Sequence, residues 1–227
     1  MKSINILSFL LLSSTLSLVA FARSFSSENP IVLPTTCHDD DNLVLPEVYD
    51  QDGDPLRIGE RYIIENPLIG GGFVYLDNIG NLPCPNAVLQ HVPIPPSLGK
   101  GTPVMFVRKS ESDYGDVVRV MTVVYIKFFV KTTPSCVDET VWKVNDEQLV
   151  VTGGKVGNEN DIFKIRKTDL VIRGMKNVYK LLHCPSHHEC KNIAVNFKNG
   201  YPRLATVDDD KDFIPFVFIK AKAYNAN

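Results

Sequence analysis

Short apolar runs separated by turn residues are the feature that most constrains this 227-residue chain. The runs are rich in Val, Ile, Tyr, Phe and Thr, and Gly, Pro, Asn or Asp bounds them, which is typical of strands. Eleven runs predict strands, at residues 61–64, 73–76, 104–107, 117–130, 141–144, 148–151, 162–165, 178–182, 193–197, 203–207 and 213–221. No long amphipathic helix is indicated. We therefore expect a single all-β domain over residues 43–227.

A repeated pattern indicates the architecture. Phe106, Phe163 and Phe218 recur at intervals of 57 and 55 residues, and a Pro stands three positions before the first and the last of them. A second echo relates residues 84–88 to residues 190–195. A period near 56 predicts three repeats of four strands, hence a β-trefoil, which is a closed barrel with a hairpin cap. A β-sandwich remains the alternative at this point.

The N-terminal residues are typical of a targeting segment. Lys2 precedes an apolar stretch over residues 4–19, and Ala20, Phe21 and Ala22 form a small-residue cleavage pattern. The stretch is too short and too rich in Ser for a membrane anchor. We expect a secretory signal peptide over residues 1–22, followed by a polar leader over residues 23–42.

Entry into the secretory pathway makes disulfides the expected use of cysteine. Cys84, Cys136, Cys184 and Cys190 can form two bridges in three possible pairings, and Cys37 is left over. Cys37 can be trimmed away with the leader, stay free or link two chains.

A cluster of His and Cys side chains offers a metal-binding alternative. His183, Cys184, His187, His188 and Cys190 lie within eight residues, and such residues can ligate zinc. A short disulfide between the two cysteines explains the same thiols more simply in an oxidising compartment. We therefore expect no metal site.

Complete catalytic sets are missing from the sequence. Residues 50–54 resemble a calcium loop, but the Gly and the Glu that an EF-hand needs are misplaced, so this stretch predicts a turn. Neither a Gly-x-Ser-x-Gly elbow nor a phosphate-binding loop is present. The sequence predicts a binding protein, not an enzyme, without a cofactor. Its net charge of −2 favours neither nucleic acid nor a membrane as partner.

One spaced motif resembles a known family. Val48, Asp50, the run 52–54 and Leu56, followed by Tyr62, match the N-terminal signature of the Kunitz-type soybean trypsin inhibitor family. The resemblance continues through all four core cysteines to the last strand. It implies the β-trefoil and the disulfides Cys84–Cys136 and Cys184–Cys190. Within the family, the chain is similar to the potato tuber branch that includes cysteine protease inhibitors.

The leader carries a second resemblance. Its residues Asn29, Pro30, Ile31, Val32, Leu33 and Pro34 are similar to a vacuolar sorting determinant of storage-organ proteins. The resemblance implies deposition in the vacuole, and secretion alone is the alternative.

The family implies an inhibitory loop within residues 97–109. The expected contact residues are Pro103, Val104 and Met105, and none is basic, so trypsin binding would require Arg108 or Lys109. An apolar segment suits the second subsite of papain-like enzymes, or the first subsite of chymotrypsin-like or subtilisin-like enzymes.

Two further turns are alternative inhibitory loops. The first covers residues 153–160 and includes Gly153 and Gly154, and the second covers residues 186–189 and includes Ser186, His187 and His188. The leading hypothesis is a monomeric inhibitor of papain-like cysteine endopeptidases. The alternatives are a serine protease inhibitor of the same fold and a non-inhibitory storage or sugar-binding protein.

Overall fold

The structure is a computed structural model of the full chain. It describes residues 44–68, 71–80, 83–91, 101–110, 115–130, 136, 140–187, 189–208 and 212–221. These residues fall in one compact unit, Val44–Asn227. The expected signal peptide, the leader with its sorting motif, and Cys37 lie outside the described residues, so those expectations stay predictions.

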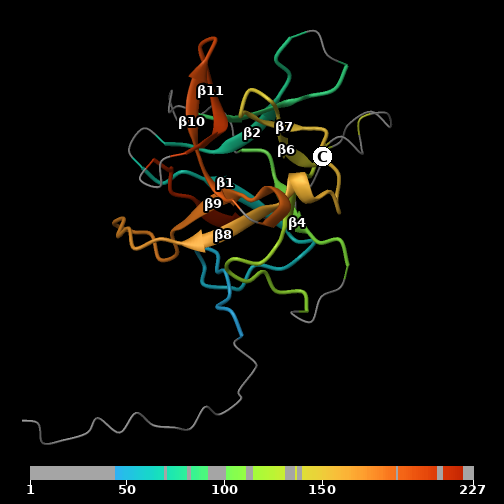
Figure 1. The fold of residues 1–227 in the computed structure, drawn as a ribbon. Helices are drawn as coiled ribbons and strands as arrows, with labels where there is room; N and C mark the ends of the chain where they lie inside the picture. Colours follow the sequence, from blue (N-terminus) through green and yellow to red (C-terminus); the bar gives the residue numbers. More distant parts are fainter. Residues whose placement is uncertain are drawn as a thin grey trace, which may run out of the picture. The chain divides into compact units, whose positions relative to one another are not determined.

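The described part of the chain is all-β, as the sequence predicted (Figure 1). Two short 3-10 helices are also present, η3 at Glu159–Asp161 and η4 at Pro185–His187. The strands are β1 Arg61–Glu65, β2 Val74–Asp77, β3 Ala87–Gln90, β4 Val104–Val107, β5 Tyr125–Phe128, β6 Trp142–Val144, β7 Val150–Thr152, β8 Phe163–Lys167, β9 Tyr179–His183, β10 Lys191–Lys198, β11 Tyr201–Val207 and β12 Val217–Lys220. Among the described residues no helix is long and apolar enough to cross a bilayer.

The strands pair in two antiparallel sheets. One has the order β12-β1-β4-β5, and the other has the order β6-β7-β3-β11-β10-β9-β8, with β2 paired to β3. Isolated bridges join the two sheets where Val124 faces Phe163 and where Tyr179 faces Phe216. Each bridge is closed by a reciprocal pair of backbone hydrogen bonds of 2.7 to 3.0 Å.

Three hairpins, β2–β3, β6–β7 and β10–β11, belong to the larger sheet. The second strands of the hairpins, β3, β7 and β11, contact one another. Ala87 of β3 faces Val151 of β7, Leu89 of β3 faces Arg203 of β11, and a bridge joins Leu149, just before β7, to Ala205 of β11. The long β10–β11 hairpin stands at the top of Figure 1.

The core confirms the first repeat. Phe106, Phe163 and Phe218 lie on β4, β8 and β12, and each is fully buried. The Phe106 and Phe218 rings meet edge to face with centroids 5.5 Å apart, and Phe163 meets Trp142 at 5.9 Å. Such aromatic pairs stabilise a core beyond the burial of their area.

The second echo was wrong as a structural repeat. Cys84 precedes β3, which is the second strand of its hairpin, whereas Cys190 precedes β10, which is the first strand of its hairpin. Val107 is only partly buried, because alternate residues of a strand face opposite sides and Phe106 occupies the core side.

Most strand boundaries differ from the predicted ones by one or two residues, two predicted runs are much longer than the strands within them, and one strand was missed. The run 117–130 is a strand only over β5, since Met121 has φ +57° and interrupts the extended chain. The run 213–221 shortens to β12. The missed strand is β3, whose four residues are all buried and so lack an alternating pattern.

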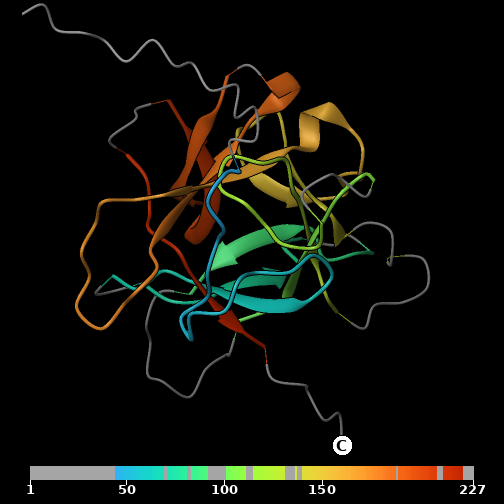
Figure 2. The same ribbon diagram turned by 90° about the horizontal axis from the view of Figure 1, so that it is seen from below.

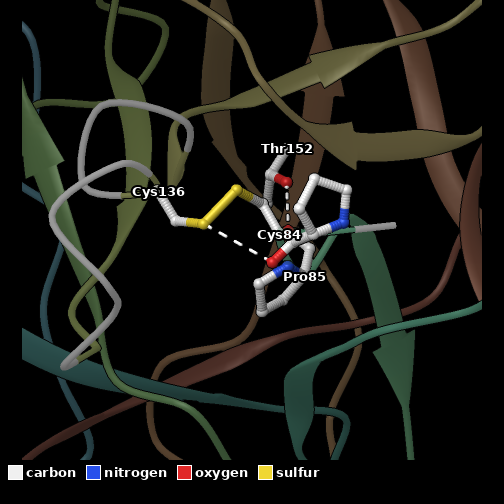
Figure 3. The surroundings of a disulfide bond; sticks show 5 residues. Cys84, Pro85, Cys136 and Thr152 are labelled. Carbon is white, nitrogen blue, oxygen red and sulfur yellow. Dashed lines mark hydrogen bonds between the residues drawn. A yellow bond between two sulfur atoms is a disulfide. The ribbon is translucent and has the colours of Figure 1, made fainter. Parts of the chain in front are cut away.

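Both disulfides that the resemblance implied are present. Cys84 bonds to Cys136, and Cys184 bonds to Cys190. Beside the first bridge, the Pro85 carbonyl oxygen accepts a hydrogen bond of 2.7 Å from Thr152 Oγ1 (Figure 3). The Thr152 amide donates to the Asn86 carbonyl oxygen at 3.1 Å. The bridge and the chain around it are thereby tied to β7.

Residues 50–54 form the predicted turn. Asp50 Oδ1 accepts hydrogen bonds of 2.9 to 3.0 Å from the amides of Asp52, Gly53 and Asp54. Gly53 has φ +97°, a conformation that favours glycine. The carboxylate therefore organises its own backbone, which is the ordinary role of Asp in such turns.

Candidate functional site

The first predicted contact segment is part of a strand. Val104 on β4 is 0% exposed and pairs with Tyr62 on one side and Phe128 on the other. Met105 is partly buried between its partners Arg61 and Lys127. Pro103 is partly buried, and its carbonyl oxygen accepts a hydrogen bond of 2.7 Å from the Phe129 amide. Residues 97–100 of the predicted inhibitory segment 97–109 lie outside the described residues. A protease could reach Val104 only by displacing β4 from the sheet.

The two basic candidates differ in availability. Arg108 donates to the carbonyl oxygens of Gly115, at 2.7 Å, and Val117, at 2.8 Å, so its guanidinium closes its own loop. Lys109 is exposed, and its side chain packs on Gly157. A Cβ atom added to Gly157 would lie 3.3 Å from Lys109 Cδ. Lys109 therefore borders the loop at residues 153–160.

The two alternative loops lie side by side. In the β8–β9 hairpin Phe163 faces His183, so the chain entering β8 and the chain leaving β9 meet at one end (Figure 2). His183 Nε2 lies 2.8 Å from the Asn160 carbonyl oxygen, and the Cys184 amide donates to Ile162 at 2.9 Å. We call residues 153–160 together with residues 184–190 the loop pair.

A buried carboxylate shapes the first loop of the pair. Asp161 Oδ2 accepts hydrogen bonds of 2.8 Å from the Lys155 amide and from Asn158 Nδ2. Asn158 caps η3, because its Oδ1 accepts from the Asn160 amide at 3.2 Å. These contacts fix the conformation of the loop without any partner.

Two glycines allow the backbone conformation and close packing at the start of this loop. Gly153 has φ +95°, and a Cβ on the buried Gly154 would lie 2.5 Å from the Trp142 carbonyl oxygen. Gly154 is therefore packed against the backbone at Trp142 and does not face solvent. The side chains that face solvent are Lys155, Val156, Asn158, Glu159 and Asn160.

The second loop of the pair is closed by the Cys184–Cys190 disulfide. Ser186 and Glu189 are exposed, and Ser186 has φ +53° in η4. His187 belongs to η4, but its side chain and all of His188 lie outside what the structure describes. Because Cys184 and Cys190 are bonded to each other, neither thiol is available for the zinc site considered as an alternative. No cluster of metal-ligating residues occurs among the described residues.

His183 joins the two loops from the interior. Its ring is buried and packs on Phe163 with centroids 5.3 Å apart. Burial lowers the pKa of His183 below its ordinary value of 6.5, against the opposing effect of the Asn160 carbonyl. The ring is therefore neutral at neutral pH, and Nε2 is the atom that donates to Asn160.

A hollow of about 430 Å³ adjoins the loop pair. Its lining includes Arg108, Lys109, Met121, Tyr125, Gly157 and Glu159. Charges of both signs surround an apolar floor, so the hollow can accept a side chain from a docked protein surface.

A sequence profile described as "Trypsin and protease inhibitor", of the Kunitz legume type, matches residues 48–220. The chain belongs to this Kunitz-type inhibitor family. Among its relatives, "Cysteine protease inhibitor 8" from Solanum tuberosum is 88% identical over 96% of this chain and 99% of its own. "Cysteine protease inhibitor 1" from the same species is 87% identical over 97% and 100%.

Solved Kunitz-type structures have a similar fold. The Kunitz-type cysteine protease inhibitor PCPI-3 from potato matches with a TM-score of 0.63 and 35% identity, over 79% of this chain and 99% of its own. Trypsin inhibitor from soybean matches with a TM-score of 0.60 and 23% identity, over 78% and 99%, and this likeness concerns the fold alone.

Sequence reasoning named both loops of this Kunitz-type chain but missed their contact. It considered His183 as a metal ligand, whereas the residue is a buried link between the loops. The spacing of Asn158 and Asp161 was a usable signal, since a capping residue followed by an acidic residue three positions later marks a helix start.

Proposed function

We propose that this protein inhibits papain-like cysteine endopeptidases by presenting the loop pair to the active-site cleft, and that it is not an enzyme. The observation that carries the proposal is the His183–Asn160 contact, which holds two exposed loops together at one end of the molecule. Relatives at 86 to 88% identity carry the name cysteine protease inhibitor. High identity across almost the whole chain supports the same activity here.

The physical basis is preorganisation. A loop already fixed by Asp161 and by the Cys184–Cys190 disulfide loses little conformational entropy when it docks. Two adjacent loops can obstruct the cleft, in which a papain-like enzyme holds its reactive Cys and His, without presenting a bond for cleavage.

Serine protease inhibition is the second candidate, and one observation favours it. Lys155 is exposed on the loop pair and carries the type of charge that the first subsite of trypsin binds. Its backbone amide is held by Asp161, so its position is defined. Arg108 contributes little to this candidate, because its guanidinium is engaged within its own loop.

We also propose a β-trefoil for the described unit. The bridges between Val124 and Phe163 and between Tyr179 and Phe216 support a ring of six strands, β12-β1-β4-β5-β8-β9. The three hairpins with mutually paired second strands support the cap, and the recurrence of Phe106, Phe163 and Phe218 supports threefold repetition.

We propose vacuolar deposition of the mature protein on the basis of the targeting motifs alone. We propose a monomer because a closed barrel leaves no sheet edge for pairing with a second chain. A storage role would be compatible with the same location. Inhibition and storage separate in a protease titration, because a pure storage protein leaves papain activity unchanged.

The loop pair is tested by a matched pair of substitutions. Val156 in the loop pair and Leu170 at the other end of β8–β9 are 43% and 45% exposed. Val156→Asp should weaken papain inhibition at least about tenfold, by inserting a charge into the contact, whereas Leu170→Asp should leave it unchanged. Equal effects of the two variants would show that the loop pair is not the contact.

A further inference from the structure

The loop between β8 and β9, residues 168–178, presents apolar side chains to solvent. Val171 is 97% exposed and Leu170 is 45% exposed. The loop extends from the edge of the sheet in both views, at the end of the hairpin opposite to the loop pair (Figures 1 and 2). An exposed apolar tip rimmed by polar residues is typical of an interaction surface.

The tip has a defined shape. At its base, the Thr168 amide donates to the Val178 carbonyl oxygen at 3.0 Å. The base of the loop is also joined to the turn at residues 50–54. Gln51 Nε2 donates to the Asn177 carbonyl oxygen at 2.8 Å, and Asn177 Nδ2 donates to the Asp50 carbonyl oxygen at 2.7 Å. At the tip, the Met175 amide donates to the Ile172 carbonyl oxygen at 3.0 Å. Leu170 and Val171 are therefore held outward by a braced loop.

Positive charge is concentrated along the hairpin that carries this tip. Residues 164–180 contain six basic residues and one acidic residue, Asp169, so the segment carries +5, whereas the whole chain carries −2. The basic residues are Lys164, Arg166, Lys167, Arg173, Lys176 and Lys180. In the part of the chain that the structure describes, none of them belongs to an ion pair.

Two of these cations lie at opposite positions of the hairpin, Arg166 on β8 and Lys180 on β9. Arg166 Nε donates to Met121 Sδ at 3.4 Å, and Lys180 Nζ lies 5.1 Å from the centre of the Phe213 ring, so both contacts are with uncharged groups. The hairpin therefore retains positive charge beside an exposed apolar tip, and an anionic partner would compensate it.

We propose that residues 164–180 dock on an anionic lipid surface, with Leu170 and Val171 entering the interface and the basic residues contacting the head groups. Several dispersed cations around an apolar tip match such a surface. A trypsin-like cleft requires a single cation in an extended segment, and the turn at Arg173–Gly174, where Gly174 has φ +84°, folds the chain back. The net charge of −2 for the whole chain favoured no membrane partner, because acidic residues elsewhere in the chain offset the +5 of residues 164–180.

Vesicle co-sedimentation of the mature protein tests the proposal. Binding should be at least about tenfold tighter to phosphatidylcholine vesicles that contain about 30% phosphatidylserine than to phosphatidylcholine alone. Raising the salt from about 50 mM to about 500 mM should abolish it, since salt screens exposed charges. Val171→Asp and the double variant Arg173→Gln with Lys176→Gln should each weaken binding at least about fivefold.

Val156→Asp is the control, because it places the same charge on an exposed apolar residue at the other end of the hairpin, although Val156 is 43% exposed and Val171 is 97% exposed. It should bind these vesicles like the unmodified protein. Equal binding to both vesicle types, no binding at low salt, or unchanged binding of Val171→Asp would overturn the proposal. Loss of protease inhibition by Val171→Asp without vesicle binding would also overturn it and assign the tip to a protease. The assay contains no protease, so its result does not depend on the inhibitory function.

Discussion

His183 Nε2 and the Asn160 carbonyl oxygen lie 2.8 Å apart and connect the end of β9 to the loop that precedes β8. The contact crosses 23 residues of sequence and sits beside the Cys184–Cys190 disulfide. Two loops that could each move alone are thereby coupled at their bases. In the function that we propose, the recognition surface therefore belongs to the two loops at one end of the β8–β9 hairpin and not to β4.

The buried imidazole should make stability depend on pH. Because the pKa of folded His183 lies below 6.5, the unfolded chain takes up the proton first as pH falls. The unfolding free energy should therefore decrease from about pH 6.5 down to the folded pKa. His183→Phe should lack this component, and thermal denaturation of both proteins between about pH 7.5 and pH 4.5 measures the difference. Identical pH profiles would contradict the assignment.

Asp161 should stabilise the first loop of the loop pair through the hydrogen bonds that its carboxylate accepts. Asp161→Ala removes the acceptor for the Lys155 amide and Asn158 Nδ2, so we expect a loss of about 1–3 kcal/mol in unfolding free energy. Papain inhibition should weaken with it, because the loop loses its internal bracing. Asp161→Asn keeps an acceptor oxygen and should retain most of both properties. Denaturant unfolding measures the change in stability, and papain titration measures the change in inhibition. Full inhibitory activity of Asp161→Ala would contradict this role.

The two disulfides should have different consequences. The bridge from Cys84 to Cys136 spans 52 residues, and replacing both by Ser should cost about 4 kcal/mol of stability with little effect on papain binding. The bridge from Cys184 to Cys190 spans 6 residues, so its removal should cost about 2 kcal/mol yet weaken papain binding at least about tenfold. The reverse order of effects on binding would place the contact away from the loop pair.

Met105→Arg distinguishes the β4 segment from the loop pair. If β4 were the reactive segment, an Arg there should create trypsin binding. Since Met105 lies partly buried between Arg61 and Lys127, we expect no gain in trypsin inhibition and a small loss of stability from the added positive charge. Trypsin titration of the variant decides, and a gain of about a hundredfold would restore β4 as the contact.

Much of this fold is predictable from local pattern, as the buried Phe106, Phe163 and Phe218 illustrate. The missing strand β3 has no polar alternation to reveal it, since both of its faces are covered. The interruption at Met121 depends on a backbone conformation that residue type does not encode, because β-branched neighbours on both sides favour a strand.

The candidate site was predictable in its parts but not in its assembly. Residues 153–160 and residues 186–189 contain turn residues that local chemistry identifies. Their contact follows from the register that sets Phe163 opposite His183, and register is a long-range property of the sheet. The family resemblance points to the segment around β4, and the burial of Val104 is a property of the sheet that the resemblance does not include.

The most direct test of the account is titration of papain with the recombinant mature protein, beside chymotrypsin, subtilisin and trypsin. We predict inhibition of papain with a dissociation constant below about 1 μM, and Val156→Asp should weaken it. Absence of papain inhibition at micromolar concentration, with nanomolar inhibition of a serine protease in its place, would contradict the central claim.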